Sequence, residues 1–109
     1  MQYGVMTDPK QKLTAAAVEA AGLSGWHHAG DTIRAEFATG DFNTGLRLVT
    51  LIGESADEAN HHPDVTLTYP AVSVTLSSHD VGGVTSRDID LARTITGHAT
   101  SLGVPAGEE

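Results

Sequence analysis

Two adjacent histidines in front of a proline are the residues of this sequence best suited to proton-transfer chemistry. His61 and His62 precede Pro63, and His79 follows shortly after them. An imidazole titrates near pH 6.5, so it both donates and accepts a proton under physiological conditions. We therefore treat His61, His62 and His79 as candidates for general acid and base catalysis.

The residues alone leave two other roles open for these histidines. At the end of a helix, His61 and His62 would be cationic caps, which oppose the negative end of the helix dipole with about 0.3–1 kcal/mol. Three histidines can also hold zinc, with water in the fourth position. Adjacent histidines seldom bind one metal together, and no carboxylate has a familiar ligand spacing, so we predict no metal. His27, His28 and His98 have no evident partners and are expected on the surface.

The elements that position the histidines begin with a short N-terminal helix. Asp8 can cap a helix over residues 9–21, because its carboxylate accepts free backbone N–H groups and Pro9 is tolerated in the first position. Gly22 stands where a left-handed residue would end this helix.

Two short strands are expected next. Residues 26–29 and 32–38 are joined around Gly30-Asp31, which is a two-residue hairpin signal. Trp26 opens this hairpin. Its ring would either stack on a flat heterocycle or, as is commoner for a lone tryptophan in a small domain, lie in the core.

A long amphipathic helix is expected from Phe42 to about Asn60. Its apolar residues recur at helical spacing and predict one buried stripe, formed by Phe42, Leu46, Val49, Ile52, Gly53 and Ala56. Leu48 widens the stripe, whereas Leu51 projects from roughly the opposite side, either under another subunit or as a lone exposed leucine. Pro63 must end the helix near Asn60. Both adjacent histidines then lie off the stripe and are not expected to be packing residues.

A second hairpin is predicted over residues 64–69 and 72–78. Apolar and hydroxyl side chains alternate along it, so one face of the sheet is covered and the other is polar. His79 falls on the polar face by alternation with Ser73 and Ser77. Because a helix end and a strand end can meet at one edge of such a layer, we expect the three histidines to share a pocket.

The last helix completes the fold. Thr85 begins it and Asp88, three residues later, completes a capping box, so a cap is the commoner role for Asp88. Its core side is expected to carry Ile89, Ala92, Ile95 and Ala99. The pattern predicts an α+β fold of order α-β-β-α-β-β-α, in which a four-stranded antiparallel sheet has three helices packed on one face. We expect one domain over residues 1–109, with loose termini at 1–7 and 103–109.

Charge and composition exclude several classes of partner. Six Lys and Arg stand against fourteen Asp and Glu, a formal charge of -8, and no basic stripe is present, so nucleic acid is not an expected partner. No segment has the apolar length of a membrane span, and residues 1–10 lack a secretory signal. We therefore expect a cytoplasmic protein with no membrane partner. The sequence has no cysteine, and a chain of this length can bury a core without disulfides.

The stretch from Asp57 to Asp88 resembles the pterin-4a-carbinolamine dehydratase family, also known for a dimerisation cofactor of a homeodomain transcription factor. The family signature is a charged residue four before a His-His-Pro, an aromatic downstream, a histidine ending the next hairpin and an aspartate opening the last helix. It reads here as Asp57, His61-His62-Pro63, Tyr69, His79 and Asp88. Gly25-Trp26 and Asp41-Phe42-Asn43 also match, so the resemblance covers roughly residues 23–99.

The resemblance implies a set of site residues. Its catalytic histidines fall on His61, His62 and His79, with Asp88 in a supporting role. The residues expected to bind the substrate are Asp57, Asn60, Ser77, Ser78, Asp80 and Trp26. Asn60 stands where many family members have aspartate, and Ser78 stands where threonine is frequent.

The implied activity is that of a 4a-hydroxytetrahydrobiopterin dehydratase, a hydro-lyase that needs no cofactor. An acid protonates the leaving hydroxyl and a base removes a ring proton, which gives the quinonoid dihydropterin. We expect His61 and His79 to transfer protons and His62 to bind and orient the pterin. The family also implies a homodimer or homotetramer. Two alternatives are a non-enzymatic dimerisation or binding module, and a dehydratase for another pterin such as a molybdopterin- or folate-related metabolite.

Overall fold

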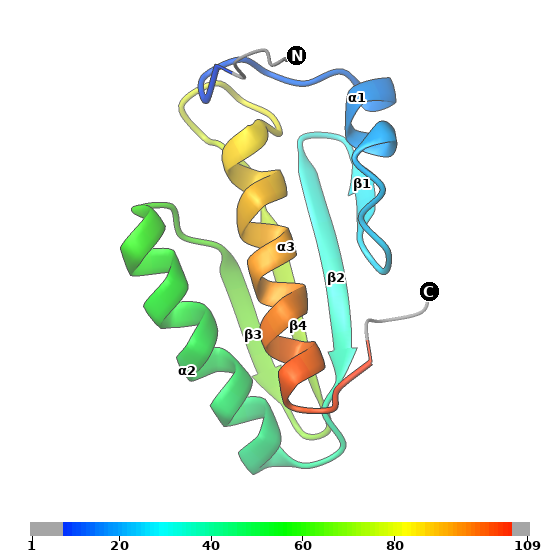
Figure 1. The fold of residues 1–109 in the computed structure, drawn as a ribbon, viewed down its shortest axis with the longest axis vertical. Helices are drawn as coiled ribbons and strands as arrows, with labels where there is room; N and C mark the ends of the chain where they lie inside the picture. The colour runs from blue at the N-terminus through cyan, green and yellow to red at the C-terminus, as the bar shows by residue number, and fades with distance from the viewer. Residues whose placement is uncertain (1–7, 106–109) are drawn as a thin grey trace.

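The computed structural model describes residues 8–105 as three helices and four strands (Figure 1). In chain order these are α1 (Ala15–Ala20), β1 (His27–Ala29), β2 (Thr32–Ala38), α2 (Phe42–Ala59), β3 (Asp64–Thr68), β4 (Ala71–Leu76) and α3 (Ser86–Ser101). This order and the antiparallel pairing of the strands confirm the predicted α+β fold. The predicted loose ends at 1–7 and 106–109 lie outside the described residues. No helix in residues 8–105 has the length and apolarity to cross a membrane.

The four strands form one sheet in the order β1-β2-β4-β3. At its centre, Ala35 of β2 and Val65 of β3 lie on either side of Val74 of β4. Alternate side chains along β2 and β4 are buried, and for β4 this confirms the predicted period of two. Figure 1 shows α3 running across the sheet, with α2 beside it on the same side and α1 next to β1. The core therefore lies between this sheet face and the helices.

The buried face of α2 differs from the predicted stripe at Phe42, Leu46 and Gly53. Gly45, Leu48, Ile52 and Ala56 are buried. Phe42 and Leu46 are 48% and 47% exposed, and Gly53 is also exposed, so their predicted burial is wrong. The reason is a close approach to the sheet, because a Cβ added at Gly45 would lie 2.6 Å from Leu67 Cδ1. A residue without a side chain thus faces the core where large apolar residues were expected.

The first helix is shorter than predicted. Thr14, not Asp8, is its N-cap and accepts a hydrogen bond from the Ala17 N–H. The Asp8 side chain instead accepts from the Lys10 N–H in a turn. The chain that follows is held by the Leu13 N–H, which donates to the Val84 carbonyl at 2.8 Å. This tertiary contact keeps residues 9–13 out of the helix despite a suitable local start.

Both hairpins occur where they were expected, with slightly shorter strands. Trp26 precedes β1 instead of opening it, and β3 and β4 end before Tyr69 and Ser77. Gly22 and Gly30 have φ values of 66° and 60°, which confirms the predicted left-handed end of α1 and suits the first turn.

The last helix begins and faces the core as predicted. Thr85 is its N-cap, and a capping box joins Thr85 and Asp88. The four predicted core residues Ile89, Ala92, Ile95 and Ala99 are all buried. The helix ends in a Schellman motif, because the N–H groups of Gly103 and Val104 donate to the Thr100 and Ala99 carbonyls. Val104 is only 5% exposed, so the packed structure extends beyond residue 103, where a loose tail was predicted.

Candidate active site

The end of α2 determines where the two adjacent histidines lie. Asn60 is the C-cap and adopts a left-handed conformation, with φ 52° and ψ 43°. This turns the chain back, and the His61 N–H donates to the Ala56 carbonyl at 3.1 Å. His61 is 9% exposed. The prediction that His61 is not a packing residue is therefore wrong, because the helical angle cannot be continued through a left-handed residue.

His61 makes a short contact with Asp88. The distance between His61 Nε2 and Asp88 Oδ1 is 2.6 Å, and the Asp88 side chain is fully buried. A carboxylate only accepts hydrogen bonds, so Nε2 carries a proton and donates it to Asp88. Nδ1 is then the ring nitrogen left to exchange a proton with another molecule. A carboxylate that fixes one imidazole nitrogen in this way sets the tautomer and orientation of the ring.

Asp88 has further partners on its second oxygen. Asp88 Oδ2 accepts from Ser78 Oγ at 2.8 Å and from the Thr85 N–H at 2.9 Å. Ser78 and Thr85 are themselves 1% and 0% exposed, and their hydroxyl oxygens are 2.8 Å apart. Asp88 therefore both caps α3, as predicted, and holds His61. These four side chains form a buried polar network: His61, Asp88, Ser78 and Thr85.

His62 has the opposite setting. Its side chain is 60% exposed, and Nε2 lies 3.0 Å from Oδ1 of Asp57, which is 82% exposed. Both residues line an open groove of about 390 Å³ between α2 and β3, together with Pro63 and Val65. Asp57 can thus orient His62 in a solvent-accessible position.

His79 lies in the turn after β4 and is exposed. The turn is closed by a bridge in which the Ser78 N–H donates to the Gly83 carbonyl at 2.7 Å. Within residues 8–105, no hydrogen bond or ion pair joins His79 to His61 or His62. The neighbouring Ser78, however, contacts Asp88 and so reaches the partner of His61. A pocket shared by all three histidines remains a prediction.

Three other residues were expected to bind substrate: Asn60, Ser77 and Asp80. Asn60 is exposed and Ser77 is half-buried, close to His61 and His79 in the chain. Asp80 forms an ion pair of 2.8 Å with Arg87, and the hydrogen bond from this guanidinium lowers the pKa of the Asp80 carboxyl. Arg87 was not identified as a site residue from the sequence. The feature that could have indicated it is a cationic residue in the first turn of α3, the helix that begins after the predicted cap Thr85.

Trp26 occupies the core. Its side chain is 8% exposed, Nε1 donates to Thr96 Oγ1 at 2.9 Å, and its ring meets Phe37 edge-on with centroids 6.1 Å apart. The hollow of about 670 Å³ that Trp26 lines between α1 and β1 also includes His27 and His28 but none of the three candidate histidines. The structure thus agrees with the core interpretation and does not bring Trp26 to the site.

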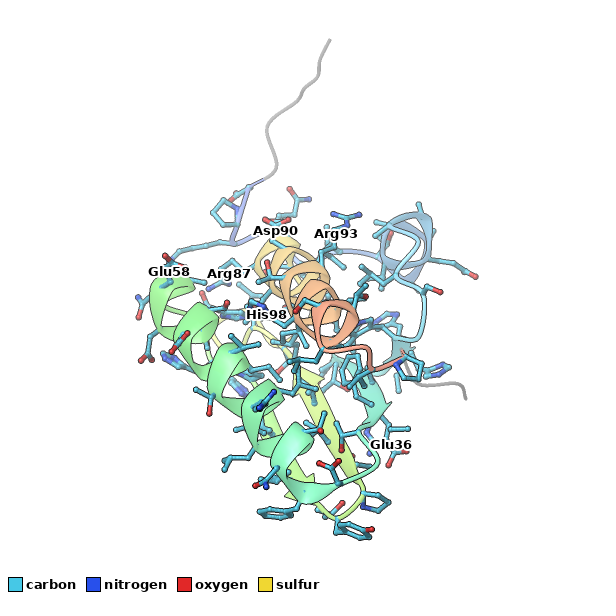
Figure 2. The ribbon with its side chains drawn as sticks, turned by 60° about the horizontal axis from the view of Figure 1, so that its bottom comes forward. Glu36, Glu58, Arg87, Asp90, Arg93 and His98 are labelled. Atoms are coloured by element: carbon cyan, nitrogen blue, oxygen red, sulfur yellow. The ribbon has the colours of Figure 1, made fainter. Side chains whose placement is uncertain are left out.

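His98 has a partner that the sequence did not reveal. Its Nε2 lies 2.7 Å from Ser55 Oγ, which links α3 to α2. Figure 2 shows His98 on α3, with Arg87 on the same helix and Glu58 on α2. The prediction of a surface histidine without a partner is wrong, because the partner comes from a facing helix.

Residues 8–105 contain no group of three His, Cys, Asp or Glu side chains placed to hold a metal ion.

Comparisons with known proteins point to one family. The family model described as Pterin 4 alpha carbinolamine dehydratase matches residues 10–98. A relative from Thermosynechococcus vestitus, provisionally named a pterin-4-alpha-carbinolamine dehydratase, is 40% identical over 88 residues, which are 79% of this chain and 93% of the relative. A Nocardia farcinica relative with the same provisional name is 42% identical over 73 residues, or 67% of this chain and 77% of the relative.

A solved structure agrees with this result. The crystal structure of a transcriptional coactivator/pterin dehydratase from Brucella melitensis superimposes with a TM-score of 0.78 at 31% identity. The match covers 82% of this chain and 99% of that protein. A pterin dehydratase-like protein identified as a RuBisCO assembly factor in the alpha-carboxysome shares the fold, with a TM-score of 0.59 at 18% identity over 69% of this chain and 89% of its own.

Proposed function

Because the chain belongs to the pterin 4 alpha carbinolamine dehydratase family, we propose that it removes water from a 4a-hydroxytetrahydropterin by histidine acid and base catalysis. The observation that carries this proposal is the buried pair of His61 and Asp88, 2.6 Å apart, directly before the exposed His62. Such a pair keeps one imidazole nitrogen protonated and leaves the other for substrate. The physiological substrate we propose is 4a-hydroxytetrahydrobiopterin.

The reaction needs two proton transfers and no oxidant. The C4a–O bond breaks as an acid protonates the hydroxyl, and water leaves. A base takes the proton from the adjacent ring nitrogen N5, and a C4a–N5 double bond forms, which gives the quinonoid dihydropterin. A positioned imidazole contributes about 10²–10⁴-fold to such steps. His61 performs one transfer through Nδ1, while Asp88 holds Nε2 and fixes the orientation of the ring.

His79 performs the other transfer, and His62 binds the pterin. His79 is exposed in the turn after β4, which the Ser78 bridge to Gly83 closes. His62 is exposed beside the groove between α2 and β3, with Asp57 to orient it. Asn60, Ser77 and Asp80 lie on the same two segments and supply polar contacts to the heterocycle.

We also propose that the chain forms a homodimer or homotetramer in the cytoplasm. Leu51, which suggested a second subunit, is half-buried, and Leu48 is fully buried in the chain itself. The exposed side of α2 offers Phe42 and Leu46 instead, which are 48% and 47% exposed. Light scattering of wild type and of a Phe42→Ser/Leu46→Ser variant tests the proposal. A monomeric wild type would contradict it.

The exposed apolar residues of α2 also favour a second candidate function, a non-enzymatic binding module. The Brucella melitensis structure is named as both a coactivator and a dehydratase, so the two functions are not exclusive in that protein. A chain that acts only as a binding module would not need the full set of His61, His62 and His79. A folded wild-type protein without any dehydration activity would favour this second candidate.

The experiment is stopped-flow decay of chemically generated 4a-hydroxytetrahydropterins, with and without the protein. Three substrates are compared: the carbinolamine of tetrahydrobiopterin, one with a methyl side chain and one of folate type. The proposal predicts accelerated decay, fastest with the biopterin side chain. Faster decay of the folate-type compound would assign another pterin, and no acceleration of any compound would contradict the activity.

A further inference from the structure

A continuous chain of hydrogen bonds leads from the surface to His61 through buried groups. Arg87 Nε lies 3.3 Å from Thr85 Oγ1, Thr85 Oγ1 lies 2.8 Å from Ser78 Oγ, and Ser78 Oγ lies 2.8 Å from Asp88 Oδ2. The final bond joins Asp88 Oδ1 and His61 Nε2 at 2.6 Å. Asp88, Ser78 and Thr85 are at most 1% exposed, so water does not compete for these bonds.

The donor and the acceptor of every bond in this chain can be assigned from the groups at its two ends, a carboxylate that only accepts and an arginine whose N–H groups only donate. Asp88 as a carboxylate accepts only, so the single Ser78 hydroxyl proton points at Asp88 Oδ2. The Ser78 oxygen must then accept the Thr85 hydroxyl proton. The Thr85 oxygen in turn accepts from two Arg87 donors, the backbone N–H at 3.2 Å and the Nε–H at 3.3 Å, because neither group can accept. The Nε–H also donates to the Pro9 carbonyl, at 2.8 Å. The side chains of Thr85, Ser78 and Asp88 are therefore held in one hydrogen-bond arrangement. The Arg87 guanidinium lies at one end of the chain of bonds and the His61 imidazole at the other.

We propose that Ser78 is a positioning residue for the dehydration reaction and does not bind the pterin. Its hydroxyl holds Asp88 in the orientation that fixes His61, and its backbone closes the turn that carries His79 by pairing with Gly83 at 2.7 Å. Ser78 thereby couples the two proton-transfer histidines. This inference rests on the proposed function. It revises the role of substrate contact for Ser78, because its hydroxyl is 1% exposed and its only proton is already donated to Asp88.

The two roles predict different kinetics. If Ser78 bound the pterin, Ser78→Ala would raise KM, since substrate binding would weaken. If Ser78 positions Asp88 and His61, the same substitution lowers kcat by about tenfold and leaves KM nearly unchanged, as removal of groups that orient a reacting imidazole does. Ser78→Thr keeps the hydroxyl and should retain most of kcat. Ser73→Ala, on the polar face of β4, is the matched control and should change neither constant.

The experiment combines these kinetics with an NMR measurement that does not depend on activity. In wild type and Ser78→Thr, the His61 Nε2–H donated to Asp88 should be visible and exchange slowly with water. In Ser78→Ala it should exchange at least about tenfold faster, because Asp88 Oδ2 then keeps only the hydrogen bond from the Thr85 N–H and the carboxylate is held less firmly. Ser78→Cys, which keeps the volume but donates weakly, replaces Ser78→Ala if the latter does not fold.

The outcomes separate this inference from the proposed function. If wild type proves inactive, the proposed function fails while the NMR measurement still decides the role of Ser78. Wild-type proton protection and kcat in a folded Ser78→Ala or Ser78→Cys variant would overturn the inference, as would a change in KM alone.

Discussion

His61 and His62 are neighbours in the chain and have the same chemistry, yet they stand in opposite environments. The His61 side chain is 10% exposed and meets a carboxylate that is fully buried. The His62 side chain is 60% exposed and meets a carboxylate that is 82% exposed. The left-handed Asn60 separates them from the helix and allows one to turn inward while the other faces solvent. A His-His pair at a helix end can thus combine a fixed proton-transfer group with an adaptable binding group.

The His61–Asp88 pair and the His62–Asp57 pair should differ most in how much each contributes to the stability of the folded protein. Asp88→Ala leaves His61 without its buried partner and removes a helix cap, so it should lower the free energy of unfolding by about 3 kcal/mol or more. Asp57→Ala breaks only an exposed pair, and its unfolding should match wild type within error. Urea denaturation followed by circular dichroism measures both. Equal losses of stability in the two variants would contradict the difference in burial.

The next difference is kinetic. His61→Ala should lower kcat by about 10²-fold or more, because it removes a proton-transfer group. His62→Ala should act mainly by raising KM, because it removes a group that binds the pterin. Single-turnover dehydration at several substrate concentrations separates the two constants. If His62→Ala lowered kcat more than His61→Ala, the roles of the two histidines would have to be exchanged.

His98 is half-buried, between these two extremes, and should show an intermediate effect. Ser55→Ala removes one hydrogen bond between α2 and α3, which should lower the free energy of unfolding by about 1 kcal/mol. Activity should be unchanged, since neither Ser55 nor His98 belongs to the proposed site. Ser24→Ala, at an exposed serine in the turn before β1, is the control for replacing a serine by alanine. A stability equal to that of the control would show that the bond contributes nothing.

The smallest effect concerns the surface pair of Asp80 and Arg87. The hydrogen bond from Arg87 lowers the pKa of Asp80, so the pair stabilises the fold above the ordinary pKa of an aspartate. This contribution is lost as the pH falls through the lowered value in the folded protein. The thermal midpoint of wild type should therefore slightly exceed that of Asp80→Asn at neutral pH, and the gap should close in acid, below about pH 4. A gap that widened toward acid would have the wrong sign.

Local patterns in the sequence were sufficient for the fold class and for most elements. The alternation in β4 and the cap at Thr85 with Asp88 depend on residues close together in the chain, and both were predicted correctly. The start of α1 was not, because the Leu13 N–H pairs with the distant Val84 carbonyl. The buried face of α2 was partly wrong for a similar reason. Its close approach to the sheet, Gly45 against Leu67, is made between segments far apart in the sequence.

The candidate site shows the same limit. His61, His62, His79 and Asp88 were identified as candidates from the sequence. Their separate environments were not, since extrapolation of the helix past Asn60 gave both adjacent histidines the same exposed setting. The partners of Ser78 and His98 come from other elements, which spacing along the chain cannot reveal.

The most direct test of histidine catalysis is single-turnover decay of 4a-hydroxytetrahydrobiopterin with wild type and with a His61→Ala/His79→Ala variant. We predict that wild type accelerates the decay strongly over buffer, whereas the folded double variant loses at least about 10²-fold of that acceleration. A double variant that dehydrated the carbinolamine at the wild-type rate would contradict histidine catalysis at this site.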